Sequence, residues 1–350
     1  MKKLSILISV LLSLTITLAA CGHRQDEDSA ATTANTVPVV AEVTGLTGET
    51  EQTLPYSETQ TVTSTTQIPT SAPSVPDDSD TKNSATAGTS GTTESASSSP
   101  SGKFEVRQMN AERDGLSIYG NLYVPETQDE KLPVVILSHS ANMTSDSMKS
   151  YCERIAKMGI VAYSFDFCGA SPQSRSDGKQ SDMTVFTEIE DLKAVLQMIK
   201  GLDFVDEQNI FLFGTSQGGL VSALTAAEIP AEIKGLILFY PAFNIPDTVQ
   251  KYAKLMPSET QSPYISTLLD YDVYEHIKPY QGDVLIVHGT TDFVVPCTYS
   301  EKAAKVYKSC ELHLIPGGTH GFNADNYVSF GNFDEKTWAY AESFLEEHIS

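Results

Sequence analysis

The segment GTSQG at 214–218 fits the G-x-S-x-G pattern of a nucleophile elbow, a sharp turn that presents a serine hydroxyl for attack. An apolar run at 209–213 precedes it, and a helical run rich in small residues follows at 218–227. A turn this tight from strand to helix requires glycine on both sides of the serine. The helix N-terminus beneath the turn also favours developing negative charge. These features predict that Ser216 is the nucleophile of an acyl-transfer reaction.

A serine hydroxyl needs a base at neutral pH, and His320 is the predicted base. It follows the last predicted strand within PGGTHGF at 316–322, where glycines on both sides let a loop bring the imidazole to Ser216. His288 ends a strand and is expected to be a buried, hydrogen-bonded group. The other histidines lie in the N-terminal tether, an early turn, an insertion, a strand and the C-terminus: His23, His139, His276, His313 and His348.

The base needs a carboxylate that fixes its tautomer, and Asp292 is the predicted partner. It follows an apolar strand at 284–288 through Gly-Thr-Thr, which places it at the carboxyl edge of the sheet. Asp283 lies at the opposite end of that strand, and Asp325 comes after the histidine in the chain. The order serine, aspartate, histidine is one known for catalytic triads, so Ser216, Asp292 and His320 are the predicted triad.

Acyl transfer also requires hydrogen-bond donors for an oxyanion. We predict the backbone N–H of Gln217, directly after the nucleophile, and that of Ala141, in the loop SHSAN at 138–142. An ordinary strand-to-helix turn is the alternative for this loop. The chemistry requires no metal and no cofactor, and the sequence has no CxxC motif or His/Cys cluster typical of a metal site.

The elements that must position these residues alternate along the chain. Apolar runs predict buried strands at 133–138, 160–167, 209–213, 235–240, 284–288 and 312–315. Helical patterns lie between or after them, at 145–158, 185–199, 217–227, 298–308 and 335–347. The alternation predicts an α/β fold with a mostly parallel central sheet and helices on both faces. Strands at 104–109 and 116–124, around a turn at Asp114-Gly115, predict an antiparallel edge.

The stretch 244–281 is longer than a plain crossover between strands. We interpret it as a helical insertion that forms a small lid; the alternative is a crossover helix with an ordinary packed face. Three of its residues are candidates for substrate contact, with simple exposure as the alternative: Tyr264, Asp270 and Tyr271.

The N-terminus indicates export. Residues 1–20 combine two lysines with an apolar run at 4–18, which is short for a membrane span, and the run closes with LAAC, which resembles a bacterial lipobox. Cys21 is therefore the predicted lipidation site, and an ordinary signal peptide with an incidental cysteine is the alternative. Residues 21–102 form the predicted disordered, Ser/Thr-rich linker, and 103–350 form the catalytic domain. We predict a protein anchored by lipid to the outer face of a bacterial cytoplasmic membrane.

The formal net charge is −22, and residues 22–102 hold eleven acids against two bases. Such an acidic chain repels nucleic acid, so no nucleic-acid partner is expected. Four cysteines follow the predicted lipidation site, and export would permit either disulfides or free thiols among them: Cys152, Cys168, Cys297 and Cys310.

Several motifs resemble those of bacterial feruloyl (cinnamoyl) esterases in the α/β-hydrolase superfamily. They are FDF at 165–167 with Gly169, SDGK at 176–179, DMTV at 182–185, EIED at 188–191, SQGG at 216–219, HG at 288–289, Asp292 and His320. The resemblance spans most of 104–348. It implies hydrolysis of esters of hydroxycinnamic or other small acids without a cofactor. Some of these proteins have a small lid domain in the position of the stretch 244–281.

The chain departs from that family at three places. His-Ser-Ala stands at 139–141 where His-Gly-aromatic is usual, Thr215 stands where histidine is common, and the stretch 168–175 is longer. We predict a serine carboxylesterase that acts through an acyl-enzyme on a small-molecule, cell-wall or plant-derived ester. One alternative is a serine peptidase of the aminopeptidase or prolyl-oligopeptidase kind. Another is a non-catalytic surface-binding lipoprotein on a hydrolase scaffold.

Overall fold

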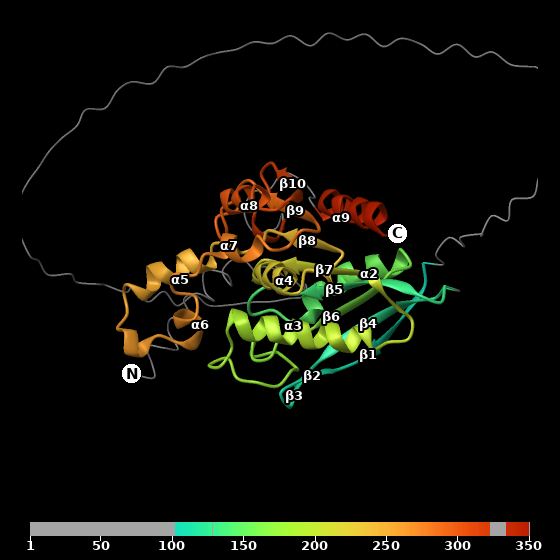
Figure 1. Ribbon diagram of the computed structural model, residues 1–350, viewed down its shortest axis with the longest axis horizontal. Helices are drawn as coiled ribbons and strands as arrows, with labels where there is room; N and C mark the ends of the chain where they lie inside the picture. The colour runs from blue at the N-terminus through green and yellow to red at the C-terminus, as the bar shows by residue number, and fades with distance from the viewer. Residues whose placement is uncertain (1–101, 128, 323–333, 350) are drawn as a thin grey trace, which may run out of the picture. The chain divides into compact units, whose positions relative to one another are not determined.

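The computed structural model describes residues 102–127, 129–322 and 334–349 (Figure 1). The predicted export signal, Cys21 and residues 22–101 of the predicted linker lie outside the described residues. In the described part of the chain, no helix combines the length and the apolar character needed to cross a bilayer.

The centre of the fold is an eight-stranded sheet with the order β1-β4-β6-β5-β7-β8-β9-β10. Its strands are β1 Phe104–Gln108, β4 Gly120–Pro125, β5 Leu132–Ser138, β6 Val161–Phe165, β7 Val205–Thr215, β8 Gly235–Phe239, β9 Asp283–Gly289 and β10 Ser309–Ile315. The six strands from β6 to β10 are parallel, whereas β4 runs antiparallel to both β1 and β6. The predicted α/β fold with a mostly parallel sheet is therefore confirmed.

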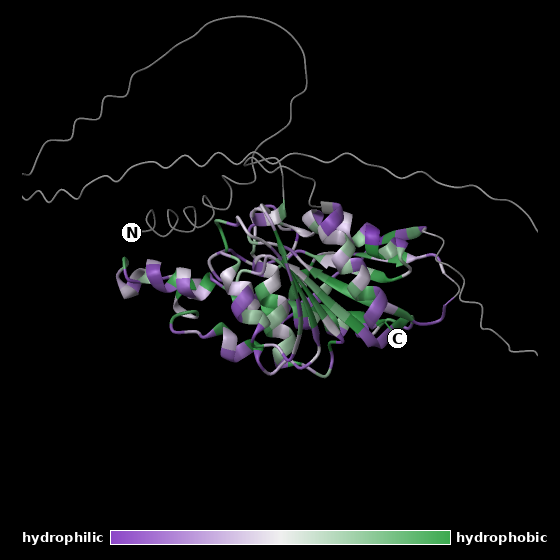
Figure 2. Cartoon of the chain, turned by 90° about the horizontal axis from the view of Figure 1, so that it is seen from above, coloured by the Kyte–Doolittle hydropathy of each residue, from purple (hydrophilic) through white to green (hydrophobic). Residues whose placement is uncertain are grey.

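Helices cover both faces of the sheet (Figure 1). Alternate side chains of β5 point in opposite directions, so Val134 and Ile136 belong to one core cluster while Val135 and Leu137 belong to the other. The first cluster includes α3 Val185–Lys200 and α4 Gln217–Glu228, and the second includes α2 Lys149–Lys157 and α9 Asp334–His348. Figure 2 shows a mainly green, apolar sheet between helices in which purple, white and green residues are mixed.

The predicted strand at 116–124 is wrong as a single element, because the chain leaves one sheet and joins another at Tyr119. The turn at Asp114-Gly115 joins β2 Ala111–Arg113 to β3 Leu116–Ile118 in a separate two-stranded sheet. The Tyr119 amide then donates to Ser176 Oγ at 2.8 Å, and the Tyr119 carbonyl accepts from the Asp166 amide at 2.9 Å. These bonds to the loop after β6 interrupt the hairpin pairing, and β4 begins one residue later.

Two predicted helices are also shorter than expected. The pattern at 145–158 divides into a short 3-10 turn, η1 Ser145–Met148, and α2, while α8 Thr298–Ala304 ends four residues before the predicted end. The stretch 244–281 is helical, with α5 Ile245–Ala253, η2 Ser258–Thr260, α6 Pro263–Ser266 and α7 Val273–Ile277. A last short turn, η3 His320–Phe322, follows β10.

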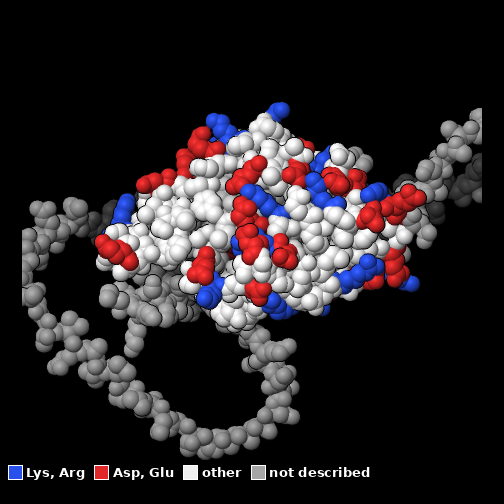
Figure 3. All heavy atoms as spheres, turned by 60° about the horizontal axis from the view of Figure 1, so that its bottom comes forward, with Lys and Arg blue, Asp and Glu red and all other residues white. Residues whose placement is uncertain are grey.

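The four cysteines of the described residues are free thiols, so no disulfide closes this part of the fold. Burial raises the pKa of both Cys152 and Cys168 to about 12, which makes these thiols poor nucleophiles. On the face seen in Figure 3, acidic and basic side chains are interspersed.

Candidate active site

Ser216 lies between β7 and α4 in a backbone conformation that is rare for a side-chain-bearing residue, with φ 50° and ψ −116°. Two backbone hydrogen bonds hold it there. The Ser216 amide donates to the Phe239 carbonyl at 3.0 Å, and the Ser216 carbonyl accepts from the Ala242 amide at 2.9 Å. The strained conformation is therefore supported by the last residue of β8 and by the chain after it, and the hydroxyl stays at the carboxyl edge of the sheet.

The glycines on either side of Ser216 are sterically required. A Cβ at Gly214 would collide with the backbone of Gly218, and a Cβ at Gly218 would collide with the carbonyl of Ser138. The close approach brings β5, β7 and α4 together directly beneath the serine. The two glycines of the G-x-S-x-G pattern are therefore needed in this chain because no side chain fits at either position.

The structure brings Ser216, Asp292 and His320 into one hydrogen-bonded chain. His320 Nε2 lies 3.0 Å from Ser216 Oγ, and His320 Nδ1 lies 2.7 Å from Asp292 Oδ2. Since an ionised carboxylate only accepts hydrogen bonds, Nδ1 carries the proton and Nε2 is free to accept the serine proton. The arrangement can therefore activate a hydroxyl for attack on a carbonyl.

Asp292 is buried and its carboxylate is fully hydrogen-bonded. Oδ1 accepts from the amides of Val294 at 2.9 Å and Val295 at 2.8 Å, while Oδ2 accepts from both His320 and His288. Burial alone would raise the pKa of Asp292, but these hydrogen bonds and the attraction of His320 outweigh it, so the pKa lies well below its ordinary value. The carboxylate remains ionised throughout the neutral range.

His288 contacts Asp292, a role that its position at the end of a strand did not reveal. Its Nε2 lies 3.1 Å from Asp292 Oδ2 and 2.8 Å from the Val295 carbonyl, so this nitrogen must be the donor to both. Its Nδ1 lies 2.7 Å from Ser300 Oγ in α8. The imidazole is completely buried and bonds the same carboxylate oxygen as His320, which restrains the position of that oxygen.

The two amides predicted for the oxyanion belong to two separate segments, the start of α4 and the turn after β5. Gln217 is the first residue of α4, so its N–H has no partner inside the helix. Ala141 lies in the turn after β5, which is closed by a hydrogen bond from the Met143 amide to the Ser140 carbonyl at 3.1 Å. The His139 ring also contacts that carbonyl through Nδ1 at 2.8 Å and thereby restrains the loop.

Two of the departures from the esterase pattern touch each other. Ser140 Oγ lies 2.9 Å from Thr215 Oγ1, which ties the loop after β5 to the elbow. Burial raises the pKa of Tyr240 to about 12, and hydrogen bonds with these two hydroxyls act in the opposite direction. The Tyr240 ring packs edge-on against His320 at a centroid distance of 4.7 Å. The Tyr240 ring therefore connects the Ser140 and Thr215 hydroxyls to the imidazole of the predicted base.

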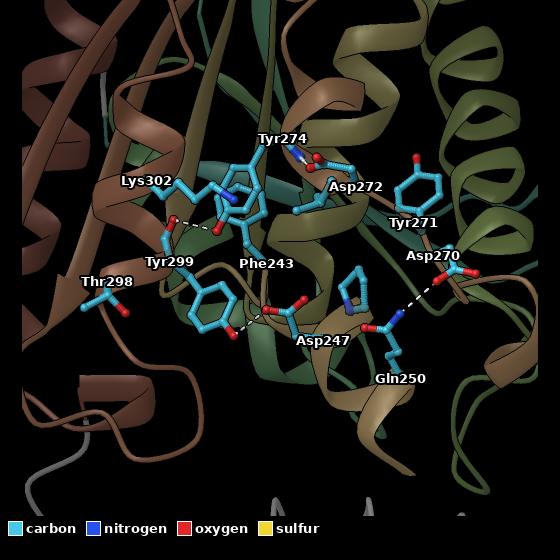
Figure 4. Close-up of a pocket in the computed structure, with 12 residues that line it drawn as sticks. Phe243, Asp247, Gln250, Asp270, Tyr271, Asp272, Tyr274, Thr298, Tyr299 and Lys302 are labelled. Atoms are coloured by element: carbon cyan, nitrogen blue, oxygen red, sulfur yellow. Dashed lines mark hydrogen bonds between the residues drawn. The ribbon is translucent and has the colours of Figure 1, made fainter. Parts of the chain in front are cut away.

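The three candidate contact residues of the insertion lie at two different places in the structure. Tyr264 donates a hydrogen bond to the Gln217 side chain, beside the nucleophile. Asp270 and Tyr271 instead line a cavity of about 550 Å³ bounded by α5, α8 and the chain before α7 (Figure 4). Its other lining residues are Phe243, Pro246, Asp247, Gln250, Asp272, Val273, Tyr274, Thr298, Tyr299 and Lys302. None of Ser216, Asp292 and His320 lines this cavity.

Comparisons with known proteins agree with this geometry. The family described as "Serine aminopeptidase, S33" matches residues 129–270. Est1E from Butyrivibrio proteoclasticus, solved with ferulic acid bound, is 30% identical, with a TM-score of 0.59 over 68% of this chain and 98% of that one. Acetyl xylan esterase 1 from Thermoanaerobacterium sp. shares the fold at 19% identity, with a TM-score of 0.53 over 73% of this chain and 87% of that one.

Curated relatives match a smaller part of this chain. A monoglyceride lipase homolog of Monkeypox virus is 28% identical over 178 residues, which are 49% of this chain and 62% of the relative. A proline iminopeptidase of Thermoplasma volcanium is 26% identical over 172 residues, which are 47% of this chain and 55% of the relative. The chain thus spans less than two thirds of these relatives.

The fold and these likenesses place the chain in the α/β-hydrolase superfamily, to which it belongs. The predicted resemblance to the α/β-hydrolases is therefore confirmed.

Proposed function

We propose that this protein is a carboxylic-ester hydrolase that acts through an acyl-enzyme, with Ser216 as nucleophile, His320 as base and Asp292 as the carboxylate that orients the base. The observation that carries the proposal is the 3.0 Å contact between His320 Nε2 and Ser216 Oγ at a strained elbow. The 2.7 Å bond to Asp292 supports it, because it leaves Nε2 unprotonated and ready to accept.

In the first step, His320 takes the Ser216 proton while the oxygen attacks the ester carbonyl. The backbone N–H groups of Gln217 and Ala141 donate to the oxyanion of the tetrahedral intermediate. His320 then gives its proton to the leaving alcohol, which departs as the acyl-enzyme forms. In the second step the same imidazole activates a water molecule, and collapse of the second intermediate releases the acid and restores the Ser216 hydroxyl.

The substrate class proposed is an ester of a hydroxycinnamic or other small acid, on a small molecule or on plant or cell-wall material. The bound ferulic acid in Est1E, 30% identical to this chain, supports an aromatic acyl group. The hydrolase residues of this chain need no metal or cofactor for the steps above.

An ester panel tests the proposal. We expect the purified protein to hydrolyse p-nitrophenyl acetate and methyl ferulate with a kcat/KM at least about 100-fold above that for aminoacyl p-nitroanilides, because Est1E, which is 30% identical, was solved with a small aromatic acid bound. Release of p-nitrophenol, ferulate and p-nitroaniline is followed spectroscopically. Faster cleavage of the anilides would overturn the ester proposal.

A serine peptidase is the second candidate function. The description of the matching family as a serine aminopeptidase and the likeness to a proline iminopeptidase both favour it. It uses the same triad and differs in the leaving group, which is an amine rather than an alcohol. The aminoacyl arm of the panel, with prolyl p-nitroanilide included, decides between the two.

We also propose that the protein is exported and anchored by a lipid at Cys21 to the outer face of the bacterial cytoplasmic membrane. The lysines and apolar run of residues 1–20 and the LAAC ending support the proposal. In a bacterial host with lipoprotein processing, the wild type is expected to incorporate labelled palmitate and to sediment with membranes. Cys21→Ser should abolish the label, and an unchanged label would contradict the assignment.

A further inference from the structure

The side chain of Gln217 is held at both ends. Its Nε2 donates to both carboxyl oxygens of Glu188, at 2.9 Å and 2.7 Å. Its Oε1 accepts from the hydroxyl of Tyr264 at 2.9 Å. Both Gln217 and Glu188 are buried, so these bonds form away from water, where breaking one leaves a polar group unsatisfied.

Glu188 is a rigid anchor for this amide. It lies in the first turn of α3, whose start is fixed by a capping box in which the Thr184 and Thr187 side chains each bond the other's backbone amide, at 3.0 Å and 2.8 Å. Burial raises the pKa of Glu188 to about 8, and the hydrogen bonds from Gln217 oppose the shift. Burying this carboxyl costs free energy that burying an apolar residue would not, and the two hydrogen bonds from the Gln217 amide offset part of that cost.

Tyr264 brings the insertion to the same amide. It lies in α6, in the stretch 244–281, and reaches a residue 47 positions earlier in the chain. A second contact joins the insertion to α3, where the rings of Tyr271 and Phe186 meet edge-on at a centroid distance of 5.3 Å. The insertion therefore packs against α3, the helix that anchors Gln217. The Tyr264 hydroxyl completes the hydrogen bonding of the Gln217 side chain.

We propose that Glu188 and Tyr264 are positioning residues that hold Gln217, and with it the backbone amide that donates to the oxyanion. This inference rests on the proposed acyl-transfer function. The Ser216 carbonyl of the peptide before Gln217 accepts from the Gly219, Leu220 and Ala242 amides at 3.0, 3.2 and 2.9 Å. The three side-chain bonds fix the Gln217 Cα and Cβ at the other end of that peptide, so the donor is held from both ends. A donor that cannot rotate is already oriented when the oxyanion forms. The insertion thus contributes to catalysis through the amide that donates to the oxyanion.

Tyr264→Phe is the principal test, because it removes one hydroxyl and keeps the ring. With p-nitrophenyl acetate, a substrate too small to need the insertion for binding, kcat is expected to fall about tenfold while KM stays within about twofold. A trifluoromethyl ketone forms a hemiketal oxyanion with the nucleophile, so its inhibition constant should rise by the same factor. The thermal midpoint is measured beside the kinetics. Tyr252→Phe is the matched control, since this tyrosine lies in α5 of the same insertion with a partly exposed side chain.

Glu188→Gln is the second arm. The substitution keeps the shape but places an amide against the Gln217 amide, so at most one of the two bonds can form. We expect a loss in kcat of about tenfold or more, with a parallel rise in the ketone's inhibition constant. Glu190→Gln is its control on the same helix, because Glu190 is exposed and pairs with Lys193. Should Glu188→Gln fail to fold, the tyrosine arm decides alone.

The outcomes separate this inference from the proposed function. A wild-type protein that cleaves no ester refutes the ester proposal, and the variants are then compared on the aminoacyl substrate that it does cleave. Wild-type activity with kcat and ketone affinity unchanged in Tyr264→Phe refutes the positioning role. A change confined to KM also refutes it, because that result would make Tyr264 a substrate contact. A lower thermal midpoint with unchanged kcat would assign a purely structural role and refute it equally.

Discussion

Replacing Ser216 by alanine is expected to lower kcat for p-nitrophenyl acetate by about 10⁵-fold or more, with the residual rate coming from the oxyanion donors and binding. The reason is geometric, because Ser216 Oγ is the oxygen that lies 3.0 Å from His320 Nε2. A fluorophosphonate probe should label the wild type and leave Ser216→Ala unlabelled, with mass spectrometry locating the adduct on the peptide that contains residue 216.

Ser222→Ala is the matched control for the nucleophile. Ser222 lies two turns along the same helix, α4, and among the described residues its buried hydroxyl has no hydrogen-bond partner. Activity and labelling should both stay within about twofold of the wild type, since the change removes only one buried oxygen. Retention of most activity by Ser216→Ala would disprove the elbow assignment. A wild type that neither turns over esters nor accepts the probe would support the binding-protein alternative.

Asp292→Asn is expected to lower kcat by about 10⁴-fold. Asp292 Oδ2 accepts hydrogen bonds from His320 and His288, at 2.7 Å and 3.1 Å. An amide nitrogen at that place would face two donors, and His320 can relieve the conflict only by moving its proton from Nδ1 to Nε2. In that tautomer the imidazole cannot accept the proton of Ser216, so the nucleophile loses its base.

The control for this change lies at the other end of the same strand. Asp283 begins β9 and bonds the Ser309 hydroxyl at 2.6 Å, far along the strand from the carboxyl edge. Asp283→Asn should keep kcat within about twofold of the wild type. Steady-state kinetics of both variants and their rates of reaction with the fluorophosphonate provide the comparison. If Asp292→Asn kept more than about a tenth of the wild-type kcat, the orienting role of this carboxylate would have to be abandoned.

Local patterns in the sequence determined much of the framework. The apolar run before GTSQG and the small residues after it predict a strand, a turn and a helix, because periodicity and glycine requirements depend on neighbours a few positions apart. The same reasoning located the parallel strands and the position of Asp292 after β9. It failed at Tyr119, where bonds to Ser176 and Asp166 divide a continuous β pattern into β3 and β4.

Only the tertiary structure decided which side chains meet. His288 and Glu188 carried no local signal for contact with the site, since Glu188 lies 29 residues from Gln217 and the His288 ring could have pointed elsewhere from the end of its strand. Tyr264 was a candidate for substrate contact, but its bond to Gln217, 47 residues away, was not predicted. Their contacts depend on the order of strands in the sheet, on the packing of α3 against α4 and on the path of the insertion. All three are determined by many weak interactions between residues far apart in the sequence, which no short window of sequence contains.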